Sequence, residues 1–322
     1  MTRDLNSITN HKPAQDPFGI DRPTGIWGAV LLPLDNSGGI SWTALTEELE
    51  ILCKTDLAGI YTNGSAGEFH NQTDAEFDRI ADTVSNVARK FGKPFQIGVS
   101  CTNPRVARQR LERVRELGAT AVQFTLPDWW PPSSYEVFRF VEGMQYSAQD
   151  TPLVIYNPPH AKVRLSLPQL SELRSIAPGL VGAKLSGGDT NWYEERRKLG
   201  EDFSVFVPGH TVAFGRPQGA DGSYSNVACL SPNGAVRLWN LAGSDPNAAQ
   251  DLEIRIQIFL KKFVLPLAKR DGLSDPALDK LLTAAGGWGP VGPALLWPYS
   301  SATADDVSAI SLAARKSIPE LF

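Results

Sequence analysis

One lysine lies inside what the sequence predicts to be a buried β-strand. Residues 180–188 form a short apolar run that two glycines end, which is typical of a strand. Because side chains alternate between the faces of a strand, Lys184 shares its face with Gly182 and Ser186. Burying an ammonium is costly and favours the neutral amine, which can attack a ketone and form a Schiff base. A lysine at the strand mouth, with its amine in water, is the alternative interpretation.

Tyr156 ends the preceding predicted strand and is the second candidate. Alternation along this strand puts its phenol on the same inner face as Val154, one strand away from Lys184. A phenol in this place can move protons to and from a carbinolamine. A core tyrosine with a satisfied hydroxyl is the alternative interpretation.

A glycine-containing loop follows the second predicted strand. Gly64 and Gly67 allow the backbone to turn its N–H groups toward an anion, and the Ser65 hydroxyl adds a donor. We expect this loop to bind the carboxylate of a substrate. We expect Glu68 to anchor the loop rather than to take part in catalysis. An ordinary tight turn is the alternative interpretation.

Aromatic and histidine side chains follow other predicted strands. Trp129 and Trp130 come after the fourth strand and indicate a pocket wall or a subunit contact, with a core role as the alternative. His160 and His210 follow the fifth and seventh strands, where either side chain could contact a substrate. The alternative interpretation is that they are loop histidines without a functional role. The histidines and carboxylates lack metal-ligand spacing, and no phosphate-binding glycine motif follows a strand, so we expect no metal and no cofactor.

The elements that must position these residues alternate between strand and helix up to about residue 240. Eight such units with short connections predict an α/β fold, a closed TIM-type (β/α)8 barrel over residues 25–240. We expect an N-terminal arm at 1–24, whose role the sequence does not indicate, and a C-terminal helical extension at 241–322. The predicted strands are 25–32, 57–61, 95–100, 121–126, 153–156, the lysine strand, 203–207 and 219–225, and helices of the extension are predicted at 248–267, 276–285 and 304–317.

Composition excludes several classes of protein. The net charge is −4 with basic residues scattered among acidic ones, which argues against a nucleic-acid partner. The 3 cysteines are widely separated, so we expect no disulfide framework and a reducing compartment. No run approaches the about 18 apolar residues of a membrane span, and the polar N-terminus does not look like a secretory signal. We therefore expect a cytoplasmic protein with no membrane partner.

Together these segments resemble the pyruvate-dependent class I aldolases of the dihydrodipicolinate synthase and N-acetylneuraminate lyase family. The resemblance implies that Lys184 forms a Schiff base with pyruvate or another small 2-oxo acid and that Tyr156 is the proton shuttle. It also implies that the loop of Gly64, Ser65 and Ala66 holds the carboxylate, and that the chain forms a homo-oligomer, a dimer or a tetramer. It covers residues 24–299 and rests on the segments 64–68, 154–159, 182–184 and 219–222.

Three positions depart from the synthases of this family. Ala66 lacks the second hydroxyl of the loop, and Trp129 stands where a neighbouring subunit would lend a tyrosine. Ala161 stands where the synthases place an arginine for their second substrate. These departures make lysine biosynthesis an unfavoured interpretation.

The sialic-acid lyases are matched no better. Their acidic pair is replaced by the segment that contains Gly209 and His210, whereas Ser186 falls where the lyases place a threonine. Together with Trp129, these residues are expected to bind a partner with fewer hydroxyl groups than a sialic acid. The resemblance thus implies a divergent member that cleaves or forms a C–C bond, or dehydrates a 2-oxo-3-deoxy acid.

Other interpretations stay open beside this lyase. One is a non-catalytic barrel that binds a 2-oxo acid, and another is dihydrodipicolinate synthase proper. A third is a barrel isomerase in which Lys184 acts only electrostatically on a bound phosphate. Residues 219–222 would then be the phosphate loop, but Asp221 would repel the phosphate.

Overall fold

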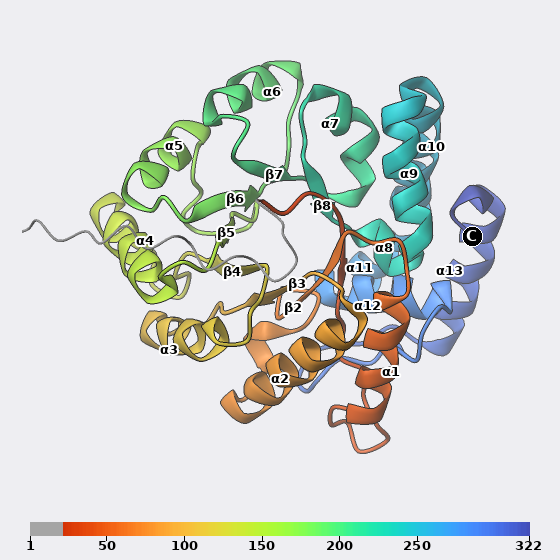
Figure 1. The fold of residues 1–322 in the computed structure, drawn as a ribbon. Coiled ribbons are helices and arrows are strands. Elements are labelled where there is room, and N and C mark those ends of the chain that lie inside the picture. The colour runs from red at the N-terminus through yellow and green to blue at the C-terminus, as the bar shows by residue number, and fades with distance from the viewer. Residues whose placement is uncertain (1–21) are drawn as a thin grey trace, which may run out of the picture.

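The chain forms a closed barrel of parallel strands with helices around it (Figure 1). The computed structural model describes residues 22–322, so most of the predicted N-terminal arm lies outside the described residues. The strands pair in chain order, and β8 closes the barrel against β1, which confirms the predicted (β/α)8 architecture. The strands are β1 (Gly25–Ala29), β2 (Gly59–Thr62), β3 (Phe95–Gly98), β4 (Ala121–Thr125), β5 (Leu153–Tyr156), β6 (Leu180–Lys184), β7 (Ser204–Phe206) and β8 (Gly222–Tyr224).

The helices that follow the strands cover the outside of the barrel. In α2, for example, Thr73 and Glu76 form a capping box at the start, and the face with Phe77, Ile80 and Val84 is buried. Within residues 22–322, no helix is long and apolar enough to cross a membrane. The helices are α1 (Trp42–Cys53), α2 (Asp74–Phe91), α3 (Pro104–Arg115), α4 (Ser134–Ala148), α5 (Leu167–Ile176), α6 (Thr190–Arg196), α7 (Val212–Gln218), α8 (Asn226–Leu230) and α9 (Pro232–Ser244).

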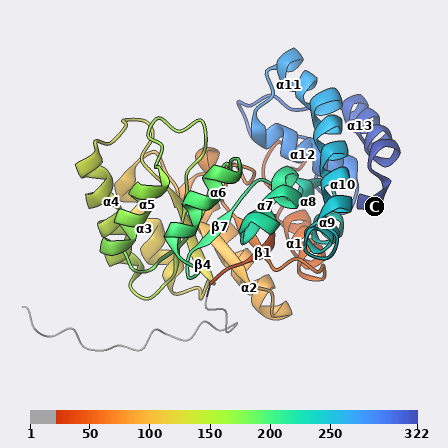
Figure 2. The same cartoon turned by 90° about the horizontal axis from the view of Figure 1, so that it is seen from above.

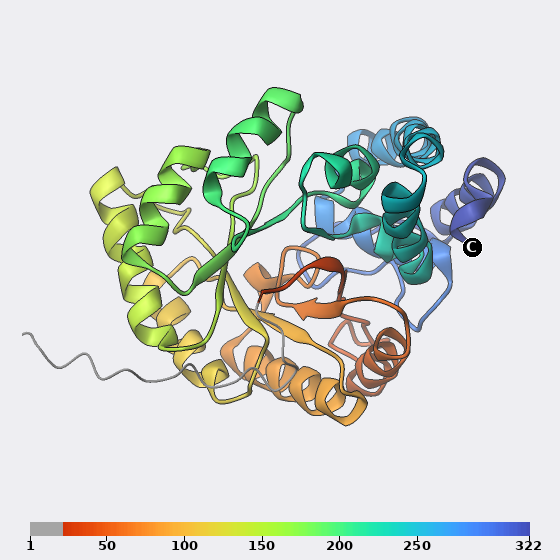
Figure 3. The ribbon, with the colours of Figure 1, turned by 45° about the horizontal axis from the view of Figure 1, so that its top comes forward.

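The C-terminal helices lie beside the barrel (Figures 2 and 3). They are α10 (Pro246–Phe259), α11 (Leu265–Asp271), α12 (Asp275–Gly286) and α13 (Ala304–Ser317), and α12 packs on α8 and α13. The helix predicted at 248–267 is interrupted, because a π-helical turn separates α10 from α11 just before Pro266, which has no amide hydrogen to donate. Residue 240 falls inside α9, and the division of the chain at this point stays a prediction.

Most strands are shorter than the sequence predicts. Pairing of β1 ends at Ala29, although the apolar run continues to Leu32, and β7 and β8 keep only three residues each. The predicted start of β8 is instead the end of α7, a helix that the sequence analysis did not predict. Gly219 ends that helix with a φ of 112°, in the left-handed region that glycine favours.

A buried ion pair ties the barrel to the C-terminal helices. Lys280 of α12 places its Nζ 2.7 Å from Oε1 of Glu68, and both side chains are fully buried. The second carboxylate oxygen of Glu68 accepts the Leu296 N–H at 2.9 Å, and Lys280 donates to the Ala294 carbonyl at 2.5 Å. Glu68 therefore anchors the loop after β2, as expected, and does so through contacts with the C-terminal part of the chain.

Replacing Lys280 by methionine should destabilise the protein strongly. The change leaves the Glu68 carboxylate buried without a counter-charge, which typically costs about 3–5 kcal/mol in the free energy of unfolding. Urea denaturation followed by circular dichroism measures this loss. The matched control is Arg113→Ala, which breaks the pair with Asp78, whose side chains are 41% and 48% exposed. A surface pair of this kind contributes about 1 kcal/mol or less, so equal losses in the two variants would contradict the prediction.

Candidate functional site

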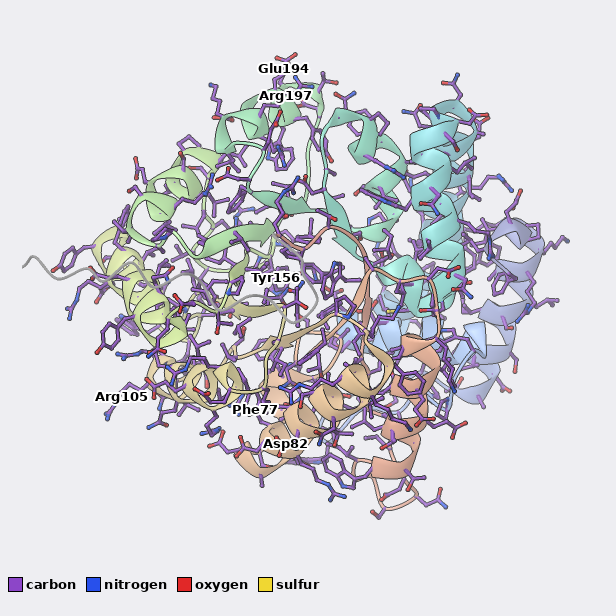
Figure 4. The ribbon with its side chains drawn as sticks, in the orientation of Figure 1. Phe77, Asp82, Arg105, Tyr156, Glu194 and Arg197 are labelled. Atoms are coloured by element: carbon purple, nitrogen blue, oxygen red, sulfur yellow. The ribbon has the colours of Figure 1, made fainter. Side chains whose placement is uncertain are left out.

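The two residues expected to carry the chemistry meet at the carboxyl ends of neighbouring strands. Tyr156 ends β5, Lys184 ends β6, and the two residues are register partners. Figure 4 shows Tyr156 in the middle of the ring of strands, whereas Asp82, Arg105 and Glu194 lie on its outer side. In barrels of this type the carboxyl ends of the strands are the face on which reactive side chains gather.

Aromatic rings surround the amine of Lys184. Its Nζ lies 4.1 Å from the ring centroid of Tyr156, 5.8 Å from that of Tyr61 and 5.7 Å from that of Tyr224. At these distances the π-faces attract a positive charge, whereas burial of the side chain disfavours it. Lys184 is half-buried, so its nitrogen is subject to both effects at once.

Tyr61 and Tyr224 are neighbours of the Lys184 amine that the sequence analysis missed. Their rings meet edge to face at 4.6 Å, and the Tyr224 hydroxyl donates to Oε1 of Gln96 at 2.5 Å. Burial raises the pKa of both phenols well above the usual value, so both are neutral near pH 7. The signal that located Tyr156, a phenol on a short predicted strand, was also available for these two residues.

The loop after β2 is held in an unusual backbone conformation. Asn63 and Glu68, at its two ends, each have a φ of 54°, in the left-handed region. Gly98 of β3 lets the start of the loop approach, because a Cβ there would lie 2.2 Å from the Asn63 carbonyl oxygen. Ala66 is buried, and its amide N–H has no acceptor within the described residues. A buried amide normally has a partner, so this one is available to an anion.

A cavity of about 110 Å³ adjoins Tyr156. It lies among the loops after β2, β4 and β5, and both Ser65 and Tyr156 line it. The loop with the available amide therefore faces the same space as the phenol. Its apolar lining includes Phe69, Leu126, Pro158, Ala161 and Val163, and its polar lining includes Asp128, Asn157 and His160.

Two other predicted residues stand at the open mouth. The indole of Trp129 is 79% exposed, and the Lys162 ammonium lies 5.6 Å from its ring centroid and donates to its carbonyl at 3.1 Å. Ser186, two residues after Lys184, is also exposed. The described residues thus leave both side chains facing solvent.

Gly209 and His210 lie in the turn after β7, against the turn after β8. The Nδ1 of His210 is 3.2 Å from Oδ1 of Asn226, a neighbour that the sequence analysis did not single out. Burial lowers the pKa of His210, so the imidazole is neutral at pH 7. A Cβ on Gly209 would lie 2.2 Å from Oγ of Ser225, which explains why the two turns can adjoin.

A carboxyl group from α12 shares the electrostatic surroundings of Lys184. Asp279 is half-buried, and burial raises its pKa to about 7, while the charge of Lys184 opposes that rise. The sequence carries no signal for this interaction, because α12 follows the last strand of the barrel. Within residues 22–322 no group of three or more His, Cys, Asp or Glu side chains is placed to hold a metal ion.

Comparison with known proteins assigns the chain to a family. The model of the Dihydrodipicolinate synthetase family matches residues 22–265. The N-acetylneuraminate lyase of Escherichia coli (strain SMS-3-5 / SECEC) is 26% identical over 250 residues, which cover 73% of this chain and 83% of that protein.

Solved structures of two further proteins share the fold. One is a prophage protein of the dihydrodipicolinic acid synthase family from E. coli K12, in complex with pyruvate. Its TM-score is 0.80 at 18% identity, and the match covers 93% of this chain and 99% of that chain. The other is a catalytic lysine mutant of the Ruminococcus gnavus sialic acid aldolase. Its TM-score is 0.81 at 19% identity, over 93% of this chain and 98% of that chain. Because the family model spans every strand of the barrel and most of the chain, this protein belongs to the dihydrodipicolinate synthetase family.

Proposed function

We propose that this chain is a class I lyase that forms a Schiff base between Lys184 and pyruvate or another 2-oxo acid. The observation that carries the proposal is the position of the Lys184 nitrogen, at the end of a barrel strand and 4.1 Å from the Tyr156 ring. Membership of a family that includes N-acetylneuraminate lyases supports a lyase acting on a small 2-oxo acid. The structural neighbour solved with pyruvate supports the choice of substrate class.

The proposed reaction begins with the neutral amine of Lys184. Its lone pair attacks the C2 carbonyl, a C–N bond forms, and the carbonyl oxygen takes a proton to give a carbinolamine. Loss of water then leaves a protonated imine, which withdraws electrons from C3. Tyr156 carries protons to and from the oxygen and C3, because its phenol is on the neighbouring strand and at the same level. The enamine that results when the C3–C4 bond breaks is the intermediate shared by cleavage and, in reverse, condensation.

The loop after β2 is proposed to hold the substrate carboxylate. The Ser65 hydroxyl and the Ala66 amide are the donors, and Gly64 gives the backbone room to present them. Two features support this role: Ser65 shares the cavity with Tyr156, and the Ala66 amide has no acceptor within the described residues. Hydrogen bonds to a charged acceptor are among the stronger ones in proteins.

The remainder of the substrate is proposed to lie between the turns after β6 and β7. Ser186, Gly209 and His210 would then line its path, with Trp129 at the opening. A neutral imidazole offers a substrate one donor and one acceptor. This set favours a partner with few hydroxyl groups, in a C–C bond cleavage or formation or in the dehydration of a 2-oxo-3-deoxy acid.

We also infer a cytoplasmic homo-oligomer, either a dimer or a tetramer. The indoles of Trp129 and Trp130 are 79% and 81% exposed, side by side at the mouth of the barrel. Large exposed aromatic side chains are enriched where a second subunit covers a surface, which supports this inference.

Trapping with pyruvate and borohydride tests the proposed nucleophile. The wild type should gain one pyruvate-sized adduct in intact-mass spectrometry, on the peptide that contains Lys184, and Lys184→Ala should gain none. The matched control is Lys162→Ala, which removes another amine at the mouth and should leave the adduct unchanged. Folded wild type that forms no adduct with several 2-oxo acids would favour the non-catalytic binding protein instead.

Replacing Tyr156 by phenylalanine tests the proton shuttle. The ring beside Lys184 stays, but the hydroxyl is lost, so adduct formation should slow by about 10²–10⁴-fold while the final adduct stays on Lys184. Rapid-quench trapping with borohydride measures the rate. Tyr135→Phe, which changes a phenol that is 72% exposed on α4, is the control and should match the wild type. Equal rates in both variants would remove Tyr156 from the mechanism.

A further inference from the structure

The turn after β7 begins beside neighbours of the reactive amine. Phe206, which ends β7, is the register partner of Lys184, and its ring centroid lies 4.5 Å from that of Tyr224. The Tyr224 ring is itself 5.7 Å from Nζ of Lys184. The turn begins at Gly209, three residues further on, and adjoins Ser225, which follows this tyrosine. The turn thus starts close to the groups that surround the amine.

The turn continues into α7, and the start of this helix has no cap of its own. The Thr211 hydroxyl makes no capping hydrogen bond to the helix that follows it. The first amides of a helix have no partner within the helix and need one from elsewhere. Here the carboxylate of Glu253 in α10 accepts the Ala213 N–H at 2.7 Å and the Phe214 N–H at 3.4 Å. Figure 1 shows α10 and α9 beside α7, so a separate part of the chain holds the start of this helix.

A second side chain of α10 reaches the turn itself. Gln257 lies one helical turn after Glu253, and its Nε2 donates to the His210 carbonyl at 2.9 Å. The imidazole of His210 is engaged as well, since its Nδ1 is 3.2 Å from Oδ1 of Asn226. His210 is therefore held through its main chain by α10 and through its side chain by α8.

The buried carboxylate of Glu253 makes this support a specific one. Glu253 is only 4% exposed, and burying a carboxylate is costly unless hydrogen bonds compensate for the lost water. Hydrogen bonds from N–H groups to a charged acceptor are among the stronger ones in proteins. Two bonds to adjacent amides fix the start of α7, and the bond from Gln257 fixes the residue at the centre of the turn. The turn is therefore held in place from outside the barrel.

We propose that Glu253 and Gln257 are positioning residues, which fix the turn after β7 and so set how well 2-oxo acids longer than pyruvate react at Lys184. This inference rests on the proposed function, in which Gly209 and His210 line the path of the substrate. Pyruvate ends at its C3 methyl group and does not need the turn, whereas a longer acid places C4 and its substituents there. Holding a contact surface in place lowers the cost of orienting a substrate, and a displacement of about 1 Å can cost about 10²-fold in rate.

The test compares two acids on single variants. The probes are pyruvate and 4-hydroxy-2-oxopentanoate, and the readout is the initial rate of borohydride-trapped adduct formation on Lys184, counting intact and pyruvate-sized adducts by mass. Gln257→Glu keeps the length of the side chain but removes the donor, and Glu253→Gln leaves one acceptor oxygen for two amides. Each should slow the reaction of the longer acid by about 10-fold and that of pyruvate by no more than about twofold. Hydrogen exchange of the peptide 208–218 should become faster by about 5-fold in both variants.

The matched control is Gln250→Glu, which makes the same substitution at another exposed position of α10 and should keep the wild-type rates and exchange. An unchanged ratio of the two rates would indicate a merely structural role and overturn the inference. Unchanged exchange in the peptide, or a wild type that reacts with pyruvate alone, would also overturn it. Gln257 is exposed, so Gln257→Glu decides if Glu253→Gln does not fold. No wild-type adduct with either acid would instead contradict the proposed function, and this inference with it.

Discussion

The ion pair between Glu68 and Lys280 is the contact on which the geometry of the site depends. Removing two charges from water is costly, and their mutual attraction offsets that cost only when the remaining hydrogen-bonding groups also find partners. Here the Leu296 amide and the Ala294 carbonyl supply those partners. The pair joins α12 to the end of the loop after β2, where Glu68 has its left-handed conformation. The proposed carboxylate site in this loop depends on that constraint.

The chemistry of the site depends on how the surroundings divide their preference between an ammonium and an amine. Three phenol rings within 6 Å of Nζ favour the charged forms, which include the protonated imine of the proposed intermediate. Partial burial of the Lys184 side chain opposes the charge. The three rings come from β2, β5 and β8, so strands on different sides of the barrel supply them together. They suit the protonated imine once it has formed.

Local periodicity accounts for what the sequence predicts well and for what it misses. Alternation along β5 and β6 was enough to place Tyr156 and Lys184 on the inner face, because register depends on a few residues of each strand. The lengths of β7 and β8 were overestimated, since pairing with neighbours, and not the apolar run alone, ends a strand. Asp279 had no signal at all. The helical pattern of α12 shows which of its faces is buried, but not which part of the barrel that face covers. The roles assigned to the site residues remain predictions from the family pattern.

The C-terminal helices are coupled to the barrel through a single turn of α12. The direct contact of Lys280 with Glu68 joins that turn to the loop after β2, and Ser65 of this loop lines the cavity beside Tyr156. Because the loop is proposed to hold the substrate carboxylate, any shift of the anchor also moves the donors of that site. Variants of the anchor should therefore be judged on their rates of adduct formation as well as on their stability.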